Sequence, residues 1–371
     1  MKIVHLAKDE KFLPLARSLF EEAFPGANTF VVRQRSGRAP TFLKPGPKVR
    51  YRRGIFFRLP WLMPELWGAD VAVIHSMTKH HACAVRGLPK RTLVVWIGYG
   101  YDYYGLLSNR IGGYWFDRTE ALMKKMGILE RHLDTMRSHV ALVAHRINVF
   151  SVNPSETDMV RAALPQLNAT YHALPSFTVE DIFAQGDARM SGLDVLLGQS
   201  SSPHNNHLEM FEVLRDTLPA AARLIVPLSY GDSRYADHVE QVGRTLFGDR
   251  FIAMRNWMPI AEYQQKISSC GFVVMNHRRQ KAVGNISSGL YRGAKVFLQR
   301  TNPLFGFFTE LGAVVYPIDL LGTDPAAAWQ PLSAELQQAN RQAIEHRFGR
   351  TQVLARIRAL EGFLTQHRQA A

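Results

Sequence analysis

GFVVMNHRRQKAVGNISSGLYRGAKVFLQ, residues 271–299, is the stretch that decides the fold. Residues 271–276 and 295–299 are apolar runs of strand length without polar alternation, which is typical of parallel strands covered on both faces. Between them lie a basic loop and a short helical piece, residues 285–293. A strand, a helix and a second strand in this order predict one repeating unit of a parallel α/β sheet.

The same alternation continues over most of the chain, in two series. The predicted strands are residues 2–6, 71–75, 92–97, 147–152 and 170–174 in the first series, and residues 194–198, 223–228, 251–254, 271–276, 295–299 and 313–318 in the second. A chain of 371 residues exceeds the size at which one hydrophobic core usually stops growing. We therefore expect two Rossmann-like parallel-sheet domains that face a cleft: residues 1–182, a polar linker at 183–192, residues 193–332, and C-terminal helices at 333–371 that pack back on the first domain.

The formal net charge of +14 favours a polyanionic partner, which could be a nucleic acid, an anionic membrane surface or a phosphorylated substrate. Two cysteines, Cys83 and Cys270, are too few for a disulfide framework or a thiolate metal site and indicate a reducing compartment. The sequence has no signal-peptide pattern and no apolar stretch of membrane-spanning length. We expect a soluble or peripheral protein.

The loop after the predicted strand 271–276 is a candidate anion site. It presents His277, Arg278, Arg279, Gln280 and Lys281 next to a helix whose start Asn285 or Ser287 could cap. Free backbone N–H groups, the helix dipole and nearby cations together suit a diphosphate. The alternative is an ordinary solvated basic loop.

Two further turns of the second domain offer ligand groups. Gly198 permits close backbone approach, while Ser200 and Asn205 could donate hydrogen bonds to phosphate or sugar. Tyr230 could stack on a base or pack in the core, and Glu310 could bind hydroxyl groups of the donor. Neither a dinucleotide fingerprint nor a P-loop is present, and the clusters HNNH and KHHAC lack a third ligand at metal-binding spacing.

In the first domain, the segment VVWIGYGYDYYG (94–105) runs from a buried strand into glycines and aromatics around Asp102. Asp102 could act as the general base on a sugar hydroxyl or orient that hydroxyl, and the alternative is a local cap or salt bridge. His75 is a second candidate base, with a structural role as its alternative.

These residues resemble a known family over residues 70 to 320. The correspondence involves Gly198, Ser200, Asn205 and His207, the tyrosine of VP..Y (Tyr230), Arg279, Gln280 and Gly284, Asn302–Pro303, and Gly100, Asp102 and Tyr104 of a Gly-x-Asp-x-Tyr pattern. The chain resembles the 4-acetamido-4,6-dideoxygalactose (N-acetylfucosamine-type) transferases of enterobacterial common antigen synthesis.

The resemblance implies a GT-B glycosyltransferase fold that needs no metal cofactor. It implies a nucleotide-sugar donor, dTDP-linked in that family, on the second domain, and a polyprenyl-diphosphate-linked saccharide acceptor on the first. Arg279, Lys281 and Arg278 would then hold the diphosphate, assisted by Ser200 and the helix N-terminus at Asn285.

The basic segment, residues 33–58, has a possible role in this scheme because no acid occurs between Ala23 and Pro64. It could hold the protein on the anionic cytoplasmic face of the bacterial inner membrane and cradle the acceptor diphosphate. Phe56, Phe57, Trp61, Leu62 and Met63 could insert shallowly. The predicted acceptor and membrane residues are Arg50, Arg52, Arg53, Phe56, Phe57, Arg58 and Trp61.

Two other functions stay open at the level of sequence. A nucleotide-sugar epimerase or hydrolase could use the same fold and would be indifferent to lipid. A nucleic-acid-binding protein could use the basic segment, although no RNP, zinc-finger or helix-turn-helix pattern occurs, so nucleic acid is not the expected partner.

Overall fold

The computed structural model describes residues 1–34, 39–107, 113–128, 137–182 and 189–370. Arg35, Arg38 and residues 183–188 of the predicted linker lie outside the described residues. The chain divides into two compact units. Unit 1 comprises Met1–Ser108, Glu130–Thr178 and Arg350–Ala371, and unit 2 comprises Asn109–Leu129 and Val179–Gly349. The chain therefore crosses between the units at positions other than the predicted domain boundaries, since residues 109–129 and 333–349 belong to unit 2.

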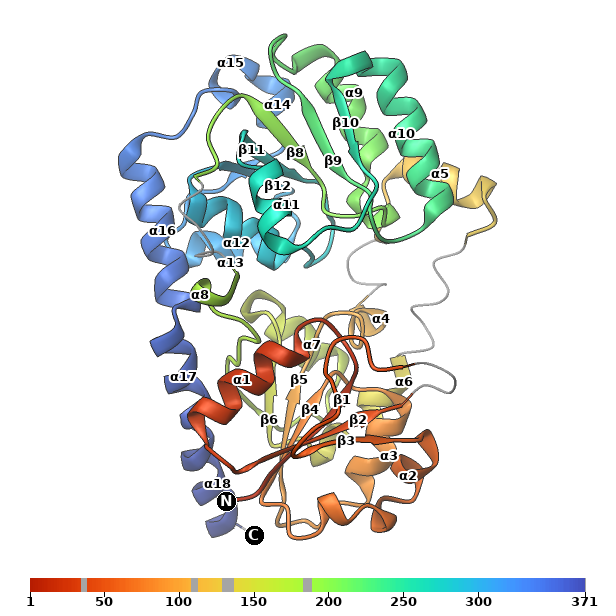
Figure 1. Ribbon diagram of the computed structural model, residues 1–371, viewed down its shortest axis with the longest axis vertical. Coiled ribbons are helices and arrows are strands. Elements are labelled where there is room, and N and C mark those ends of the chain that lie inside the picture. The colour runs from red at the N-terminus through yellow and green to blue at the C-terminus, as the bar shows by residue number, and fades with distance from the viewer. Residues whose placement is uncertain (35–38, 108–112, 129–136, 183–188, 371) are drawn as a thin grey trace. The chain divides into compact units, whose positions relative to one another are not determined.

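The described residues of unit 1 form a seven-stranded parallel sheet in the order β3-β2-β1-β4-β5-β6-β7 (Figure 1). Its strands are β1 (Ile3–Lys8), β2 (Asn28–Arg33), β3 (Val49–Arg52), β4 (Val71–His75), β5 (Leu93–Ile97), β6 (Val149–Ser151) and β7 (Thr170–Tyr171). All the strands predicted for this half are present. β2 and β3 were not predicted. β3 is an edge strand in which Arg50 and Arg52 alternate with Val49 and Tyr51, so it lacks the apolar run of a buried strand, whereas β2 has a short buried run at residues 30–32 that was overlooked.

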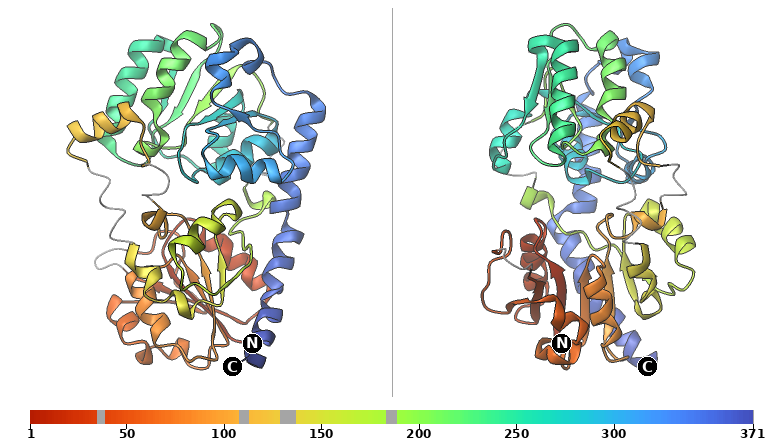
Figure 2. Two further views of the ribbon diagram at one scale, coloured as in Figure 1. Left: turned by 180° about the vertical axis from the view of Figure 1, so that it is seen from behind. Right: turned by 90° about the vertical axis from the view of Figure 1, so that its right-hand side faces the viewer.

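Helices cover both faces of this sheet. They are α1 (Leu13–Ala23), α2 (Gly54–Arg58), α3 (Lys79–Arg86), α4 (Tyr104–Leu107), α6 (Arg137–Ala141), α7 (Thr157–Ala163), α17 (Arg350–Arg358) and α18 (Leu360–Ala370). Val353, Leu354 and Ile357 of α17 pack with Val71 and Val73 of the sheet, so the last helices complete the core of unit 1, as predicted (Figure 2). The preceding helix, α16 (Ala334–Phe348), packs instead on unit 2.

The described residues of unit 2 form a six-stranded parallel sheet in the order β10-β9-β8-β11-β12-β13. Its strands are β8 (Asp194–Leu197), β9 (Leu224–Pro227), β10 (Phe251–Met254), β11 (Cys270–Met275), β12 (Lys295–Leu298) and β13 (Tyr316–Pro317), and each matches a predicted strand. The helices are α5 (Asp117–Lys125), α8 (Val179–Ile182), α9 (His207–Thr217), α10 (Ser233–Phe247), α11 (Ile260–Lys266), α12 (Val283–Arg292), α13 (Pro303–Glu310), α14 (Leu320–Thr323), α15 (Pro325–Ala328) and α16. In Figure 1, α9 and α10 lie along β9 and β10, and Phe211, Tyr235 and Val239 of these helices fill the core against the sheet.

The strand orders define one switch point in each sheet. In unit 1 the chain adds strands on one side of β1 and then continues with β4 on its other side; in unit 2, β8 and β11 have the same relationship. Ligands of open α/β sheets bind beyond the carboxyl ends of the strands at such points. Among the helices of the described residues, none combines the length and apolar composition needed to cross a bilayer.

Candidate functional site

The loop after β8 is organised by the buried amide of Asn205. Its Nδ2 donates to the carbonyl oxygens of Ser200 (2.9 Å) and Ser202 (2.8 Å), which fixes Oδ1 as the acceptor. Oδ1 accepts from the backbone N–H of Gln199 (3.0 Å) and from Nε2 of His277 (3.0 Å). The amide is therefore fully used in shaping the loop and joining it to the loop after β11, rather than pointing to a ligand.

The loop after β11 ends at an uncapped helix. The structure contradicts the prediction that Asn285 or Ser287 caps it, because α12 begins at Val283, and its N-cap residue Ala282 has a left-handed backbone (φ 64°) and no capping side chain. Asn285 lies inside the first turn, where its Nδ2 donates to the Tyr263 hydroxyl (3.1 Å). The first N–H groups of α12 are thus left without a side-chain cap at the sheet's switch point.

Two arginines of this loop are held against an aromatic stretch that the sequence analysis missed. The Arg279 guanidinium lies over the Tyr114 ring (5.5 Å), and that of Arg278 lies over Phe116 (5.1 Å) and donates to the Trp115 carbonyl (3.3 Å). Asn206, before α9, accepts from the Phe116 N–H (3.0 Å) through Oδ1 and ties the same stretch to the sheet. The sequence signal was three adjacent aromatics after a glycine, but nothing in it indicates the arginines they meet.

Three imidazoles surround this cationic corner and stay neutral. Burial lowers the pKa of His204 and His277 well below the usual value and that of His207 to about 3, and the positive charge of Lys281 acts on all three in the same direction. Arg279 is almost fully buried here. Concentrated positive charge next to free helix N–H groups is an arrangement that binds phosphate oxygens.

The remaining predicted donor residues are Tyr230, Gln280, Gly284 and Glu310. Tyr230 is half exposed, which disfavours its alternative role in the core; the carbonyl of Tyr230 accepts from the Ser201 backbone N–H (2.9 Å), so its loop joins the loop after β8. Gln280 and Gly284 lie within the loop and first turn already described. Glu310 is exposed at the last residue of α13, about 10 Å along the helix from Pro303, and its donor role stays a prediction.

In unit 1, Asp102 is enclosed by the turn that follows β5. Its carboxylate accepts from the backbone N–H of Met77 (2.8 Å) and Tyr99 (2.9 Å) and from Nε1 of Trp96 (2.9 Å). Burial raises the pKa of Asp102, while these donors oppose that rise. Because the side chain is fully buried, this geometry suits a group that positions the turn better than a base that touches substrate.

His75 belongs to an internal chain of hydrogen bonds. Asn28 Nδ2 donates to the Phe24 carbonyl (2.8 Å), so its Oδ1 accepts from Nε2 of His5 (3.1 Å). His5 Nδ1 then accepts from Nε2 of His75 (2.9 Å), and His75 Nδ1 accepts from the Tyr99 hydroxyl (3.0 Å). Burial lowers the pKa of both imidazoles, that of His5 to about 3, so both rings are neutral with fixed tautomers.

A carboxylate that the sequence analysis did not single out, Glu10, lies at the switch point of unit 1. It follows β1 by two residues and is partly exposed, and the Tyr101 hydroxyl contacts both of its oxygens (3.2 and 3.3 Å). Burial raises the pKa of Glu10 to about 7. The rule that ligands meet the carboxyl ends of parallel strands could have directed attention to it.

The described residues of the basic segment include regular structure, namely the end of β2, all of β3 and α2. Phe57 is fully buried against the rings of His80 and His81, and Met63 is also fully buried, so the prediction that these two side chains insert into a membrane is wrong. Arg52 is paired with Glu65. Exposed side chains of this segment and of the residues just after it include the cations Lys44, Lys48, Arg50, Arg53 and Arg58 and the apolar Ile55, Trp61, Leu62 and Trp67, while Phe56 is half-buried.

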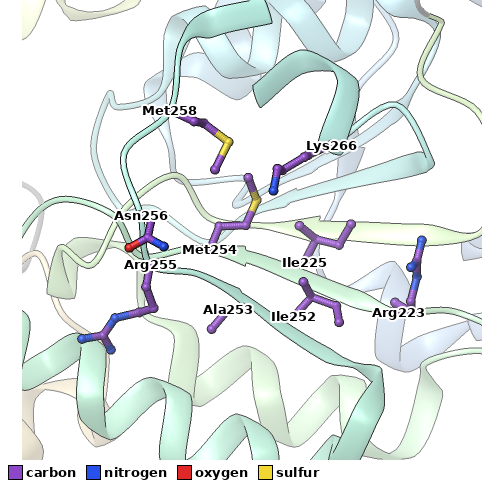
Figure 3. A pocket seen from close by; sticks show the side chains of 9 residues that line it. All are labelled: Arg223, Ile225, Ile252, Ala253, Met254, Arg255, Asn256, Met258 and Lys266. Carbon is purple, nitrogen blue, oxygen red and sulfur yellow. The ribbon is translucent and has the colours of Figure 1, made fainter. Parts of the chain in front are cut away.

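A surface pocket of about 330 Å³ lies in unit 2 against β9 and β10. Figure 3 shows Ile225 and Ile252 side by side on the paired strands β9 and β10, with Met254 and Met258 on the side away from Arg223. Its cation Arg223 is paired with Asp194, and Arg255 with Asp237. The pocket shares no lining residue with the loops at the switch point. Within the ranges that the structure describes, no three histidine, cysteine or acidic side chains gather as metal ligands do.

Several solved structures share this architecture, among them enzymes that act on nucleotide sugars and sugar phosphates. The chain is similar to sucrose-phosphate synthase from Thermosynechococcus elongatus (11% identity, 100% of both chains, TM-score 0.65). It is also similar to HepE of Anabaena in complex with UDP and glucose (13% identity, 98% of this chain and 99% of that one, TM-score 0.63). A third similar structure is α,α-trehalose 6-phosphate synthase from Burkholderia multivorans (12% identity, 100% and 99%, TM-score 0.58). Two parallel-sheet units with switch-point loops of this kind define the GT-B class, which confirms the expected fold class.

The family follows from the sequence of the second half. The model of the 4-alpha-L-fucosyltransferase family, glycosyl transferase group 56, matches residues 148–342, which is more than half of the chain. The chain belongs to this family and is a glycosyltransferase, which uses a nucleotide-sugar donor and a glycan acceptor. The family assignment favours sugar transfer over the epimerase alternative.

Proposed function

We propose that this glycosyltransferase moves a deoxy or amino sugar from a nucleoside-diphosphate donor, dTDP-linked, to a polyprenyl-diphosphate-linked saccharide in bacterial surface polysaccharide synthesis. The observation that carries the donor half is the switch point of unit 2. There the uncapped N-terminus of α12 follows Arg279 and Lys281, and the loop after β8 is held against it through Asn205. These N–H groups and cations neutralise the departing diphosphate without a metal cofactor, so EDTA leaves transfer unchanged.

The sugar class has support from two directions. The matched family is described by fucosyl transfer, and fucose is a 6-deoxygalactose. The transferases that the sequence resembles carry 4-acetamido-4,6-dideoxygalactose, which is also a 6-deoxygalactose but has an acetamido group in place of the C4 hydroxyl. A 6-deoxygalactose donor with a small apolar C5 substituent is common to both.

Calorimetric titration of the purified chain with dTDP, UDP, GDP and CMP tests the donor site. We expect one nucleoside diphosphate to bind, with dTDP the first candidate, and Arg279→Ala to weaken it at least tenfold, because a charge-assisted contact to phosphate contributes about 1.5–3 kcal/mol. Arg244→Ala is the matched control, since Arg244 is exposed on α10 and pairs with Glu240. Loss of affinity in both variants, or in neither, would refute the assignment.

For the acceptor half, we propose that unit 1 rests on the cytoplasmic face of the inner membrane. Ile55, Trp61, Leu62 and Trp67 are exposed on consecutive turns, and the Trp67 indole donates to the Trp61 backbone carbonyl (3.0 Å), which ties these turns together. Arg50, Arg53 and Arg58 supply exposed charge close in sequence. Each such cation contributes about 1 kcal/mol at an anionic surface, and exposed aromatics suit the interface.

Flotation with phosphatidylglycerol and phosphatidylcholine vesicles tests this surface. We expect binding to the anionic vesicles alone, and Trp61→Ser with Ile55→Ser to reduce it severalfold. Trp257→Ser is the matched control, because Trp257 is an exposed tryptophan in unit 2. Equal binding by all variants, or no preference for anionic lipid, would count against a membrane role for the segment.

A further inference from the structure

Three side chains from three neighbouring strands meet at the switch point of unit 1. Glu10 follows β1, Ser76 follows β4, and Tyr101 lies in the turn after β5. The Tyr101 hydroxyl contacts both the Glu10 carboxylate and Ser76 Oγ. The backbone of Glu10 is fixed as well, because its carbonyl accepts from the N–H of Leu13 at the start of α1 (3.0 Å).

The backbone of Ser76, at this cluster of three side chains, is in a strained conformation. Ser76 has a left-handed backbone conformation (φ 63°), which residues other than glycine rarely adopt. It is held there because its N–H donates to the Ile97 carbonyl (2.9 Å) and its carbonyl accepts from Nδ1 of His81 (2.6 Å). Backbone strain of this kind gathers at functional sites.

Burial and the neighbouring charges together bring the pKa of Glu10 to about 7. Burial is the largest cause of its raised pKa, and the carboxylates of Asp102 and Asp9 add to it. Lys8, whose Nζ lies over the Tyr101 ring (4.0 Å), and the hydrogen bond from Tyr101 act in the opposite direction. A partly exposed carboxylate with a pKa close to 7 can take up a proton and release it again at physiological pH.

We propose that Glu10 is the general base of the transfer and that Tyr101 positions it. This rests on the proposed function. The Glu10 carboxylate accepts the proton of the acceptor hydroxyl while that oxygen forms its bond to the anomeric carbon of the donor sugar. The bond from that carbon to the diphosphate breaks, and its electron pair leaves with the nucleoside diphosphate. Asp102, which is enclosed in the turn, holds Tyr99 and the following Tyr101 in place.

Transfer from dTDP-4-acetamido-4,6-dideoxygalactose to a prenyl-diphosphate-linked saccharide, followed between pH 5.5 and 9, tests the base. We expect the wild-type kcat to fall about tenfold per pH unit below pH 7, and Glu10→Gln to lower kcat about 10²- to 10⁴-fold at pH 8 and remove this limb. Tyr101→Phe should move the limb to higher pH, because the lost hydrogen bond favours the charged carboxylate. Glu10→Asp restores part of the rate.

Two further readouts separate catalysis from folding and from donor binding. Glu10→Gln should keep the nucleotide affinity and raise Tm at pH 8, because a carboxylate whose pKa is raised on folding destabilises the fold once it is ionised. Asp158→Asn, an exposed acid on α7, is the control with unchanged kcat. A Glu10→Gln variant with a wild-type rate and acid limb would refute the base. A wild-type chain that binds nucleotide and transfers nothing would refute the transfer itself, and the base with it.

Discussion

Oδ1 of Asn205 accepts a hydrogen bond from Nε2 of His277 at 3.0 Å and thereby joins the two loops at the switch point of unit 2. The two residues come from the loops after β8 and β11, which lie on adjacent strands. Since Asn205 also holds Gln199, Ser200 and Ser202, one buried amide fixes the shape of the whole corner.

Asn205→Ala should loosen this corner without touching a ligand. Each buried group left without a partner costs about 1–3 kcal/mol, so the variant should be clearly less stable in urea unfolding and bind nucleoside diphosphate more weakly. Asn205→Asp should be worse, because the carboxylate cannot donate to the two carbonyls that Nδ2 now satisfies. Wild-type stability in both variants would contradict the role given to the amide.

Gly198 should be intolerant of a methyl group for two reasons. Its backbone is left-handed (φ 70°), and a Cβ would lie 2.7 Å from Nε2 of His207 and 2.8 Å from Oδ1 of Asn205. Gly127 has nearly the same φ (67°) with nothing within 4 Å of a Cβ, so Gly127→Ala shows the conformational cost alone, about 1–2 kcal/mol. We expect Gly198→Ala to lower Tm by clearly more than Gly127→Ala. Equal shifts would mean that the close approach has no energetic weight.

Substitutions of Phe57, in the basic segment, and of Trp61, just after it, should distinguish a side chain that packs in the core from one that lies on the surface. Phe57→Ala should cost about 3–5 kcal/mol, since the side chain is fully buried. Trp61→Ala should stay within about 0.5 kcal/mol of wild type, since this ring is 62% exposed. Chemical denaturation measures both. A stability loss at Trp61 would show that the ring belongs to the fold and not to a free surface.

The buried histidine chain should make unit 1 sensitive to acid. His5 and His75 have a folded pKa below the unfolded value of about 6.5, so their contribution to stability is complete above pH 6.5 and is lost as the pH falls towards the folded values. Each histidine contributes up to about 1.4 kcal/mol per pH unit in that window. Nitrogen-detected NMR should show both rings neutral and protonated on Nε2 at pH 6. A His75 ring that is protonated on both nitrogens at pH 6 would contradict the chain of hydrogen bonds.

The sequence predicted most of the buried strands, because uninterrupted apolar runs have few uses other than parallel strands; the buried strand β2 was missed although residues 30–32 form such a run. The edge strand β3 was not predicted, since Arg50 and Arg52 interrupt any apolar run and only its pairing with β2 identifies it as a strand. The same arginines made the basic segment resemble a loop, although Phe57 lies in the core.

The sequence predicted where the candidate sites lie, but not the role of each residue in them. Strand ends and basic residues led to the loops after β8 and β11, yet the use of Asn205 as an organiser depends on His277, 72 residues away. Glu10 escaped entirely because its proton affinity depends on burial and on Tyr101, 91 residues further along the chain. Chemistry created by such distant contacts leaves no local pattern.

The packing of α17 on the sheet of unit 1 also dictates an order of events during translation. Val353, Leu354 and Ile357 leave the ribosome after every residue of unit 2, so unit 2 can finish folding while one apolar face of the earlier-made sheet is still uncovered. The half of the enzyme that is synthesised first is therefore the half that matures last. A nascent chain interrupted before residue 350 would carry a folded unit 2 and an incomplete unit 1, an intermediate that exposes apolar surface to chaperones and proteases.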